Sequence, residues 1–85
     1  MSALIADTID TATARLHAAG VPSPRADAEI LVGHVLGLGR GNLLARSLVG
    51  GRVDEDDLTA ISALLVRRES REPLQHITGE AYFRS

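Results

Sequence analysis

The 85-residue sequence contains no cysteine, which excludes a disulfide framework and a thiolate metal site. It also lacks lysine, so that all nine basic residues are arginine. The only aromatic residues are Tyr82 and Phe83, and the core must therefore be built from aliphatic side chains. No apolar run approaches the roughly 20 residues that cross a bilayer, and residues 1–10 lack the pattern of a secretory signal. We therefore expect a cytoplasmic protein that does not enter a membrane.

Basic charge is not in excess, because the net charge is −2. A domain that binds nucleic acid by neutralising phosphates usually carries a basic surplus, so the charge argues against a direct nucleic-acid partner. The length suffices for one domain, and the hydrophobic share of 45% suffices for a core. We expect a monomer.

Apolar residues that recur every three or four positions predict the first two helices. The first helix should end at Gly20. The second should start after Ser23, a candidate N-cap, with Pro24 in its first turn, and should end at Gly37. Its apolar positions cover more than one stripe, so we predict that it is the central helix. The stripe of the first helix consists of Ile5, Ile9, Ala12, Leu16 and Ala19.

Two further helices follow. A short one is predicted over residues 43–49, ended by two glycines, and a longer one begins at Asp54, a good N-cap followed by acidic residues in the first turn. Val53 and Leu58 are spaced to form a hydrophobic staple across that cap. The buried stripe of the fourth helix should consist of Leu58, Ile61, Leu64 and Leu65.

Pro73 prevents the fourth helix from continuing. Residues 74–77 predict one more helical turn before Gly79, and residues 80–84 have strand-like character without a partner strand in the chain. The predicted fold class is therefore all-α: a small bundle of four main helices plus one short helical turn, followed by a strand-like linker that is unpaired. We place a helical domain at residues 1–72 and a linker at residues 73–85.

Patterns that suggest a catalytic or ligand site have simpler explanations. Residues 37–41 read Gly-x-Gly-x-Gly, but a nucleotide-cofactor loop must follow a strand, and no strand is predicted before them. The histidines His17, His34 and His76 lack the spacing of a helical metal pair, and the acidic residues 54–57 suit a helix start. We predict no catalytic, cofactor-binding or metal-binding residue in this chain.

Arginines carry the remaining polar signals. Arg25 and Glu29, four residues apart on one helix, predict a surface ion pair. Arg67, Arg68 and Arg71 fall in the predicted last turn of the fourth helix, where the helix dipole favours cations. The same cluster would also suit an anchor for an acidic partner surface or for a following domain, and the sequence leaves both interpretations open.

Residues 67–79, which read Arg-Arg-Glu-Ser-Arg-Glu-Pro-Leu-Gln-His-Ile-Thr-Gly, resemble a signature of the HemK-like release-factor glutamine methyltransferases, as does the aromatic residue that follows them. Residues 23–31 resemble the Ser-x-Arg-x-Asp-Ala-Glu-x-Leu segment of that family. The order and spacing also agree, so the likeness covers essentially the whole chain. The resemblance implies a set of candidate residues for contacts with a partner or with a neighbouring domain: Arg67, Arg68, Arg71, Pro73, Leu74, His76, Ile77, Gly79 and Phe83.

The resemblance implies a helical N-terminal domain that a β-hairpin linker joins to a Rossmann-fold domain using S-adenosylmethionine. Members of the family methylate the side-chain nitrogen (N5) of the glutamine in the Gly-Gly-Gln motif of peptide-chain release factors. Their catalytic signature, Asn-Pro-Pro-Tyr, is not in this chain, whose only asparagine, Asn42, precedes Leu43. The implied role is therefore non-catalytic: contact with the release factor and with the enzyme's own catalytic domain, which we expect beyond residue 85.

Three alternatives remain open at this point. One is a stand-alone helical protein–protein adaptor. An acyl carrier protein would need Asp-Ser-Leu at the start of its second helix, and the nearest match is Arg46-Ser47-Leu48. A helix-turn-helix DNA-binding domain would use residues 42–49 as its recognition helix, which offers only Asn42, Arg46 and Ser47 as polar contacts.

Overall fold

The structure is a computed structural model that describes residues 2–79, and these residues form five helices and one two-stranded sheet. The predicted all-α bundle is confirmed, with four longer helices and one short one. No helix in the described range has the length and apolar character that a bilayer crossing requires. In chain order the elements are β1 (Ser2–Leu4), α1 (Ile5–Ala18), α2 (Pro24–Leu36), α3 (Arg40–Leu48), β2 (Arg52–Asp54), α4 (Glu55–Glu69) and α5 (Leu74–Thr78).

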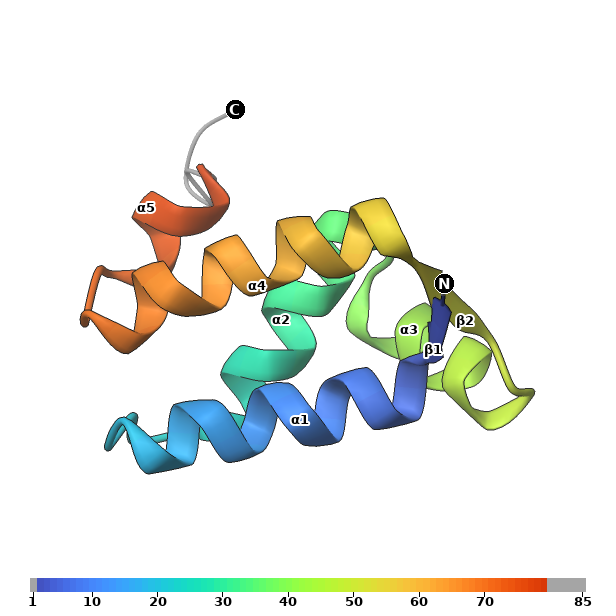
Figure 1. Cartoon of the computed structure of the whole chain (residues 1–85), viewed down its shortest axis with the longest axis horizontal. Helices are drawn as coiled ribbons and strands as arrows, with labels where there is room; N and C mark the ends of the chain where they lie inside the picture. The colour runs from blue at the N-terminus through green and yellow to red at the C-terminus, as the bar shows by residue number, and fades with distance from the viewer. Residues whose placement is uncertain (1, 80–85) are drawn as a thin grey trace.

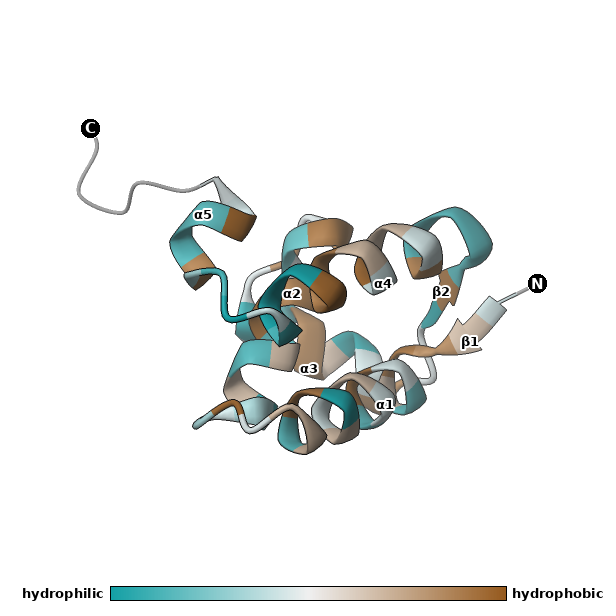
Figure 2. Ribbon diagram, turned by 60° about the vertical axis from the view of Figure 1, so that its left-hand side comes forward, coloured by the Kyte–Doolittle hydropathy of each residue, from teal (hydrophilic) through white to brown (hydrophobic). Residues whose placement is uncertain are grey.

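The helices are arranged around α2, which contacts each of the other four. In Figure 1, α1 and α4 cross the view with α2 between them, α3 lies at one end, and α5 lies at the other end beside α4. Figure 2 shows hydrophobic positions recurring along α1, α2 and α4, where these helices pack together. The prediction that the second helix is central is confirmed.

The core is aliphatic, as the shortage of aromatic residues requires. Its buried side chains come from all five helices and from β2. Each large one contributes on the order of 2 kcal/mol when it leaves water. The largest fully buried side chains are Ile9, Leu16, Leu31, Val32, Leu43 and Val53.

Helix starts and ends follow the sequence in most places. The Asp54 side chain caps α4 by accepting a hydrogen bond from the Asp57 backbone N–H at 2.9 Å. Ser23 occupies the N-cap position of α2, but its side chain makes no capping hydrogen bond. Gly37 ends α2 in the left-handed conformation, as predicted. The third helix begins at Arg40, three residues earlier than the sequence pattern indicates.

The small sheet was not predicted. Strand β1 pairs antiparallel with β2, with Ala3 opposite Val53, and the Ile5 N–H donates to the Gly51 carbonyl at 2.8 Å. A Cβ on Gly51 would lie 2.8 Å from the Arg46 carbonyl oxygen, so this close approach requires glycine. The prediction that no strand precedes residues 37–41 is wrong, because strands of three residues are too short to show an alternating pattern.

Candidate functional site at the bend between α4 and α5

Helix α4 ends in a Schellman motif that turns the chain toward α5. The Arg71 N–H donates to the Arg68 carbonyl at 2.9 Å, and the Glu72 N–H donates to the Arg67 carbonyl at 3.2 Å. Arg71 has a φ of 71°, the left-handed conformation in which glycine is usual. Arg67 and Arg68 lie in the last turn as predicted, but the placement of Arg71 there is wrong, because α4 already ends at Glu69.

Arg68 joins this bend to α2. Its Nε donates to Asp27 at 3.0 Å, and its Nη1 donates to the Glu72 carbonyl at 3.0 Å. The two side chains are mostly buried, with exposed fractions of 17% and 11%. Removing one partner of such a pair is costly because the other is left as an uncompensated buried charge.

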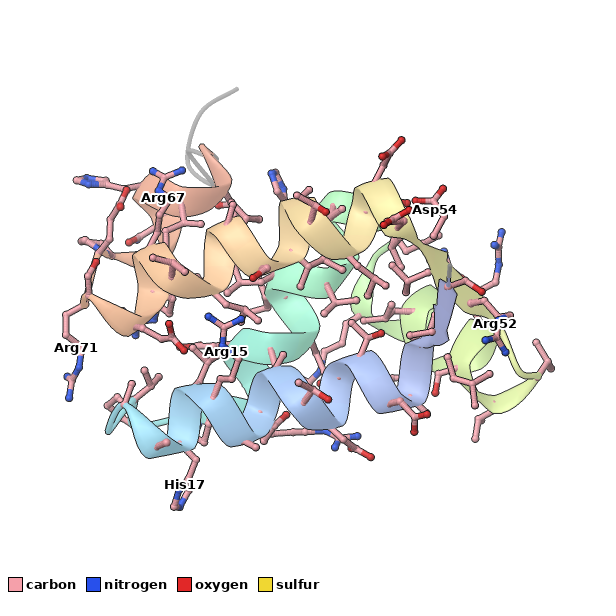
Figure 3. All side chains as sticks on the ribbon, viewed as in Figure 1. Arg15, His17, Arg52, Asp54, Arg67 and Arg71 are labelled. Atoms are coloured by element: carbon pink, nitrogen blue, oxygen red, sulfur yellow. The ribbon has the colours of Figure 1, made fainter. Side chains whose placement is uncertain are left out.

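Arg71 joins the bend to the end of α1. Its Nη2 donates to the Gly20 carbonyl at 2.9 Å, and Figure 3 shows the side chain reaching from the bend along that end of the molecule. The carbonyls at a helix C-terminus attract a cation, because the helix dipole is negative there. A Cβ on Gly20 would lie 3.0 Å from this guanidinium nitrogen. The Arg71 side chain therefore anchors the bend at the C-terminal end of α1.

Arg67 joins the bend to α5. Its guanidinium donates to both carboxylate oxygens of Glu72, and its Nη2 also donates to the His76 carbonyl at 3.3 Å. The hydrogen bond from Arg67 holds the pKa of the Glu72 carboxyl below its ordinary value, and the same contact raises the pKa of Arg67. The three arginines thus fasten one short turn to three different helices.

The remaining predicted contact residues form α5 itself. Pro73 precedes the helix, and its carbonyl accepts hydrogen bonds from the N–H groups of His76 and Ile77 at 3.0 and 3.2 Å. Ile77 is buried, Leu74 is half-buried and His76 is exposed. Gly79 ends the helix in the left-handed conformation. The structure therefore brings the predicted residues together from 67 to 79, whereas Phe83 lies outside the described residues.

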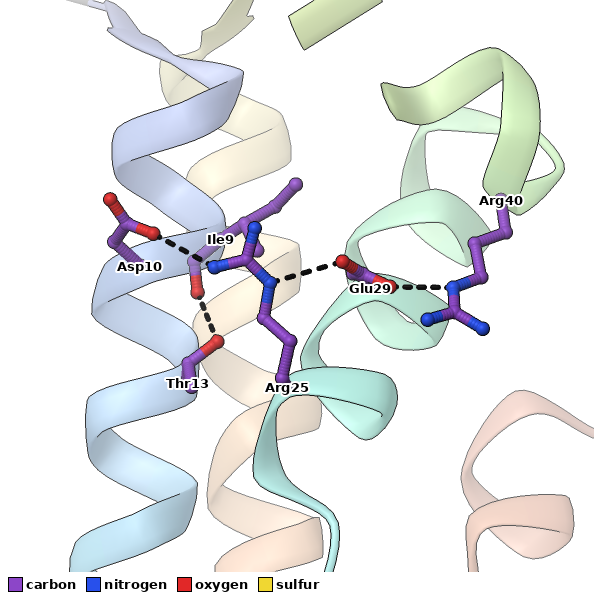
Figure 4. A network of polar contacts seen from close by, with 6 residues as sticks. All are labelled: Ile9, Asp10, Thr13, Arg25, Glu29 and Arg40. Carbon is purple, nitrogen blue, oxygen red and sulfur yellow. Dashed lines mark hydrogen bonds and ion pairs between the residues drawn. The ribbon is translucent and has the colours of Figure 1, made fainter. Parts of the chain in front are cut away.

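A second ionic cluster surrounds Glu29 on α2 (Figure 4). Its carboxylate accepts hydrogen bonds from Arg25 Nε at 3.0 Å and from Arg40 Nε at 2.6 Å, while Arg25 also binds Asp10 at 3.1 Å. The predicted pair of Arg25 with Glu29 is confirmed, but it is not a surface pair, because the Glu29 side chain is only 5% exposed. Arg40, eleven residues away, was not predicted as a partner.

Two opposing effects act on the pKa of Glu29. Burial favours the neutral carboxyl and would raise the pKa, but the hydrogen bonds and charges of Arg25 and Arg40 outweigh it, so the pKa lies below the ordinary value. The Arg25 pKa is raised, chiefly by its hydrogen bond to Glu29. At neutral pH the cluster therefore stabilises the joint between α2 and α3.

The glycine-rich residues 37–41 do not fit a nucleotide-like cofactor. They connect α2 to α3, and a phosphate- or nucleotide-binding loop of this spacing needs a strand directly before it. Their interpretation as a turn between two helices is confirmed. Within residues 2–79, no three His, Asp or Glu side chains are grouped closely enough to share a metal ion.

Comparison with known proteins identifies relatives along nearly the whole chain. The release factor glutamine methyltransferase of Streptomyces coelicolor is 48% identical over 85 residues, which cover 99% of this chain and 27% of that protein. The enzyme of the same name from Deinococcus radiodurans is 47% identical over 74 residues, covering 87% of this chain and 26% of its own length. That of Escherichia coli is 43% identical over 61 residues, covering 72% and 21%. The chain thus spans about a quarter of the length of these curated relatives.

No solved structure shows a significant match to the chain. The family model described as the PrmC N-terminal domain matches residues 7–79, which include α2, α3, α4 and the whole bend. Because this match covers most of the sequence and agrees with the resemblance seen in residues 23–31 and 67–79, the chain belongs to the PrmC N-terminal domain family.

Proposed function

We propose that this chain serves as the non-catalytic N-terminal domain of a cytoplasmic release factor glutamine methyltransferase. In this role it contacts the release factor and orients the catalytic domain. The observation that carries the proposal is the family match over residues 7–79, together with relatives of that name at 43–48% identity. Binding of S-adenosylmethionine and methyl transfer to the glutamine of the Gly-Gly-Gln motif then belong to the rest of such a protein. The match gives no support to the adaptor, acyl-carrier or helix-turn-helix alternatives.

The geometry of the bend supports an orienting role. Arg67, Arg68 and Arg71 fasten it to α5, α2 and α1, so the direction of the chain at Gly79 is set by the whole bundle. An enzyme that acts on one glutamine of a large protein needs such control, because a misplacement of about 1 Å can lower the rate by about a hundredfold.

The test compares the intact methyltransferase with a form that lacks residues 1–72. Methyl transfer is measured on whole release factor and on a short peptide that contains Gly-Gly-Gln. We expect the deletion to raise the KM for release factor by about tenfold, which is the effect of losing one strong contact region. The peptide should be methylated at an unchanged rate, because it reaches only the catalytic domain.

The peptide reaction is the control for folding of the truncated enzyme. If the peptide rate holds and the KM for release factor does not change, the domain does not contact the substrate. If the peptide rate falls as well, a second measurement decides: backbone amide shifts of the isotope-labelled chain during titration with release factor. Shifts confined to one helical face would support the proposal, and none at high concentration would refute it.

A further inference from the structure

The end of α3 exposes two large hydrophobic side chains to solvent. Leu48 is 86% exposed and Val49 is 81% exposed, and they are consecutive in the chain. In the part of the chain that the structure describes, Val66 on α4 is the other large hydrophobic side chain with high exposure, at 55%. In Figure 1, α3 and the turn after it lie at the end of the molecule opposite α5. Exposed apolar side chains that gather into a patch often mark a binding surface in soluble proteins.

The surface beside these residues is hollowed. A cavity of about 430 Å³ is lined by Leu38, Asn42, Ala45, Arg46 and Val49. Leu38 also borders a second cavity, of about 580 Å³, which reaches α5 at Leu74 and Gln75. Leu38 therefore lies between a cavity at α3 and a second cavity that reaches the helix after the bend. We call the residues Leu38, Asn42, Ala45, Arg46, Leu48 and Val49 the α3 face.

The charge around the α3 face differs from that of the whole chain. Residues 30–53 contain three arginines and no carboxylate, although the chain carries a net charge of −2. Arg40 is neutralised by Glu29. Arg52 donates to the hydroxyl and carbonyl of Ser2, which leave its charge in place, and Arg46 makes no ion pair with any residue in the range 2–79. The α3 face thus combines exposed aliphatic side chains with the uncompensated charge of Arg46, and Arg52 on the following strand β2 carries a second such charge.

We propose that the α3 face is the surface on which this domain docks the release factor, through a segment of that protein that presents aliphatic side chains beside carboxylates. This inference rests on the proposed function and names the contact surface. Carboxylates would pair with Arg46 and Arg52, and aliphatic groups would cover Leu48 and Val49. A phosphate backbone fits less well, because it would leave both aliphatic side chains in water and would meet a chain of negative net charge.

The experiment uses the intact methyltransferase with Val49→Asp, which places a carboxylate in the apolar part of the α3 face. Val66→Asp is the matched control, because it makes the same change at an exposed apolar site on α4. We expect Val49→Asp to raise the KM for release factor by about tenfold. Val66→Asp should change it by less than about twofold, and both variants should methylate a short Gly-Gly-Gln peptide at the wild-type rate.

A second variant tests the charge. Arg46→Glu should raise the KM for release factor, and the KM should then respond less to added salt than in the wild type, because salt screens exposed charge pairs. Circular dichroism of each variant should match the wild type, since neither Arg46 nor Val49 is buried.

The deletion of residues 1–72 distinguishes the two ways of failing. If the deletion raises the KM but Val49→Asp and Arg46→Glu do not, the release factor binds another face and this inference is wrong, while the proposed function stands. If neither the deletion nor the variants raise the KM, both are wrong. If the variants weaken binding of a single-stranded RNA to the intact enzyme and leave the KM for release factor unchanged, the α3 face serves nucleic acid and the inference is also wrong.

Discussion

Gly33 in the last turn of α2 provides a sharp test of the structure, because helix propensity and packing predict opposite effects. Replacing a helical glycine by alanine normally stabilises a helix by about 1 kcal/mol. In this structure, however, a Cβ on Gly33 would lie 2.6 Å from the Leu38 carbonyl oxygen, well inside van der Waals contact. The Leu38 N–H also donates to the Gly33 carbonyl at 2.9 Å, so the turn cannot move away without losing that hydrogen bond.

We therefore expect Gly33→Ala to destabilise the domain. Forcing a methyl group into a packed site costs typically about 1–3 kcal/mol, which exceeds the gain in helix propensity over most of that range. The net loss should be about 1 kcal/mol, which lowers the midpoint of thermal unfolding by roughly 4–8 °C for a domain of this size. Thermal and urea unfolding of the 85-residue chain, followed by helical circular dichroism, would measure it.

Gly41 in α3 is the matched control, because a Cβ there would meet no atom within 4 Å. Gly41→Ala should leave stability unchanged or raise it by up to about 1 kcal/mol. If Gly33→Ala proves as stable as the wild type, the close approach of Leu38 to α2 is wrong, and so is the shape of the hollow that Leu38 borders.

Three further predictions concern polar groups. Asp54→Ala should cost about 1 kcal/mol in a urea unfolding experiment because a capping hydrogen bond is lost, whereas Ser23→Ala should cost much less because Ser23 makes no such bond. Arg68→Ala should cost on the order of 3 kcal/mol, since it leaves Asp27 buried without its partner; Asp27→Asn combined with it should recover part of the loss. Glu29→Gln should be less stable than the wild type at pH 7, and this difference in stability should shrink as the pH falls below about 4.5. The reason is that a carboxyl whose pKa is lowered by folding loses its stabilising effect when it takes up a proton. An unfolding series from pH 7 to pH 3 measures the difference, and a constant difference would contradict the prediction.

Local signals in the sequence predicted the helices well, because each depends on residues close together in the chain. The spacing of Ile5, Ile9 and Leu16 indicates the buried stripe of α1. The Asp54 side chain caps the start of α4, and Gly37 ends α2 in the left-handed conformation that a residue without a side chain adopts easily. The short pairing of β1 with β2 could not be predicted in this way, since its partners are about 50 residues apart and each strand has only three residues.

In the candidate site, too, the sequence indicates local features but not contacts between distant residues. The signature in residues 67–79 pointed to a segment that the structure gathers into one bend, but not to the contacts within it. Nothing near Arg68 in the sequence indicates Asp27, which is 41 residues away, as its partner. Arg71 at a left-handed position was also missed, because glycine is the residue that marks such a position in a sequence. The exposure of Leu48 and Val49 was not foreseen either, since apolar spacing alone does not tell which side chains a small bundle can cover.

Leu38 relates the two proposals in space, because it lines both the cavity beside α3 and the cavity that reaches α5. The first cavity is lined by residues of the α3 face, and the second is lined by Leu74 on α5, the helix whose direction the three arginines fix. Docking on the α3 face and orientation by the bend are therefore assigned to neighbouring but separate surfaces. Loosening the bend and blocking the α3 face should then have different kinetic effects. Val49→Asp should raise the KM for release factor. Arg68→Ala frees the bend without touching the α3 face, so it should lower kcat for release factor more than it raises KM. Equal effects of the two variants on both constants would contradict this separation of docking from orientation.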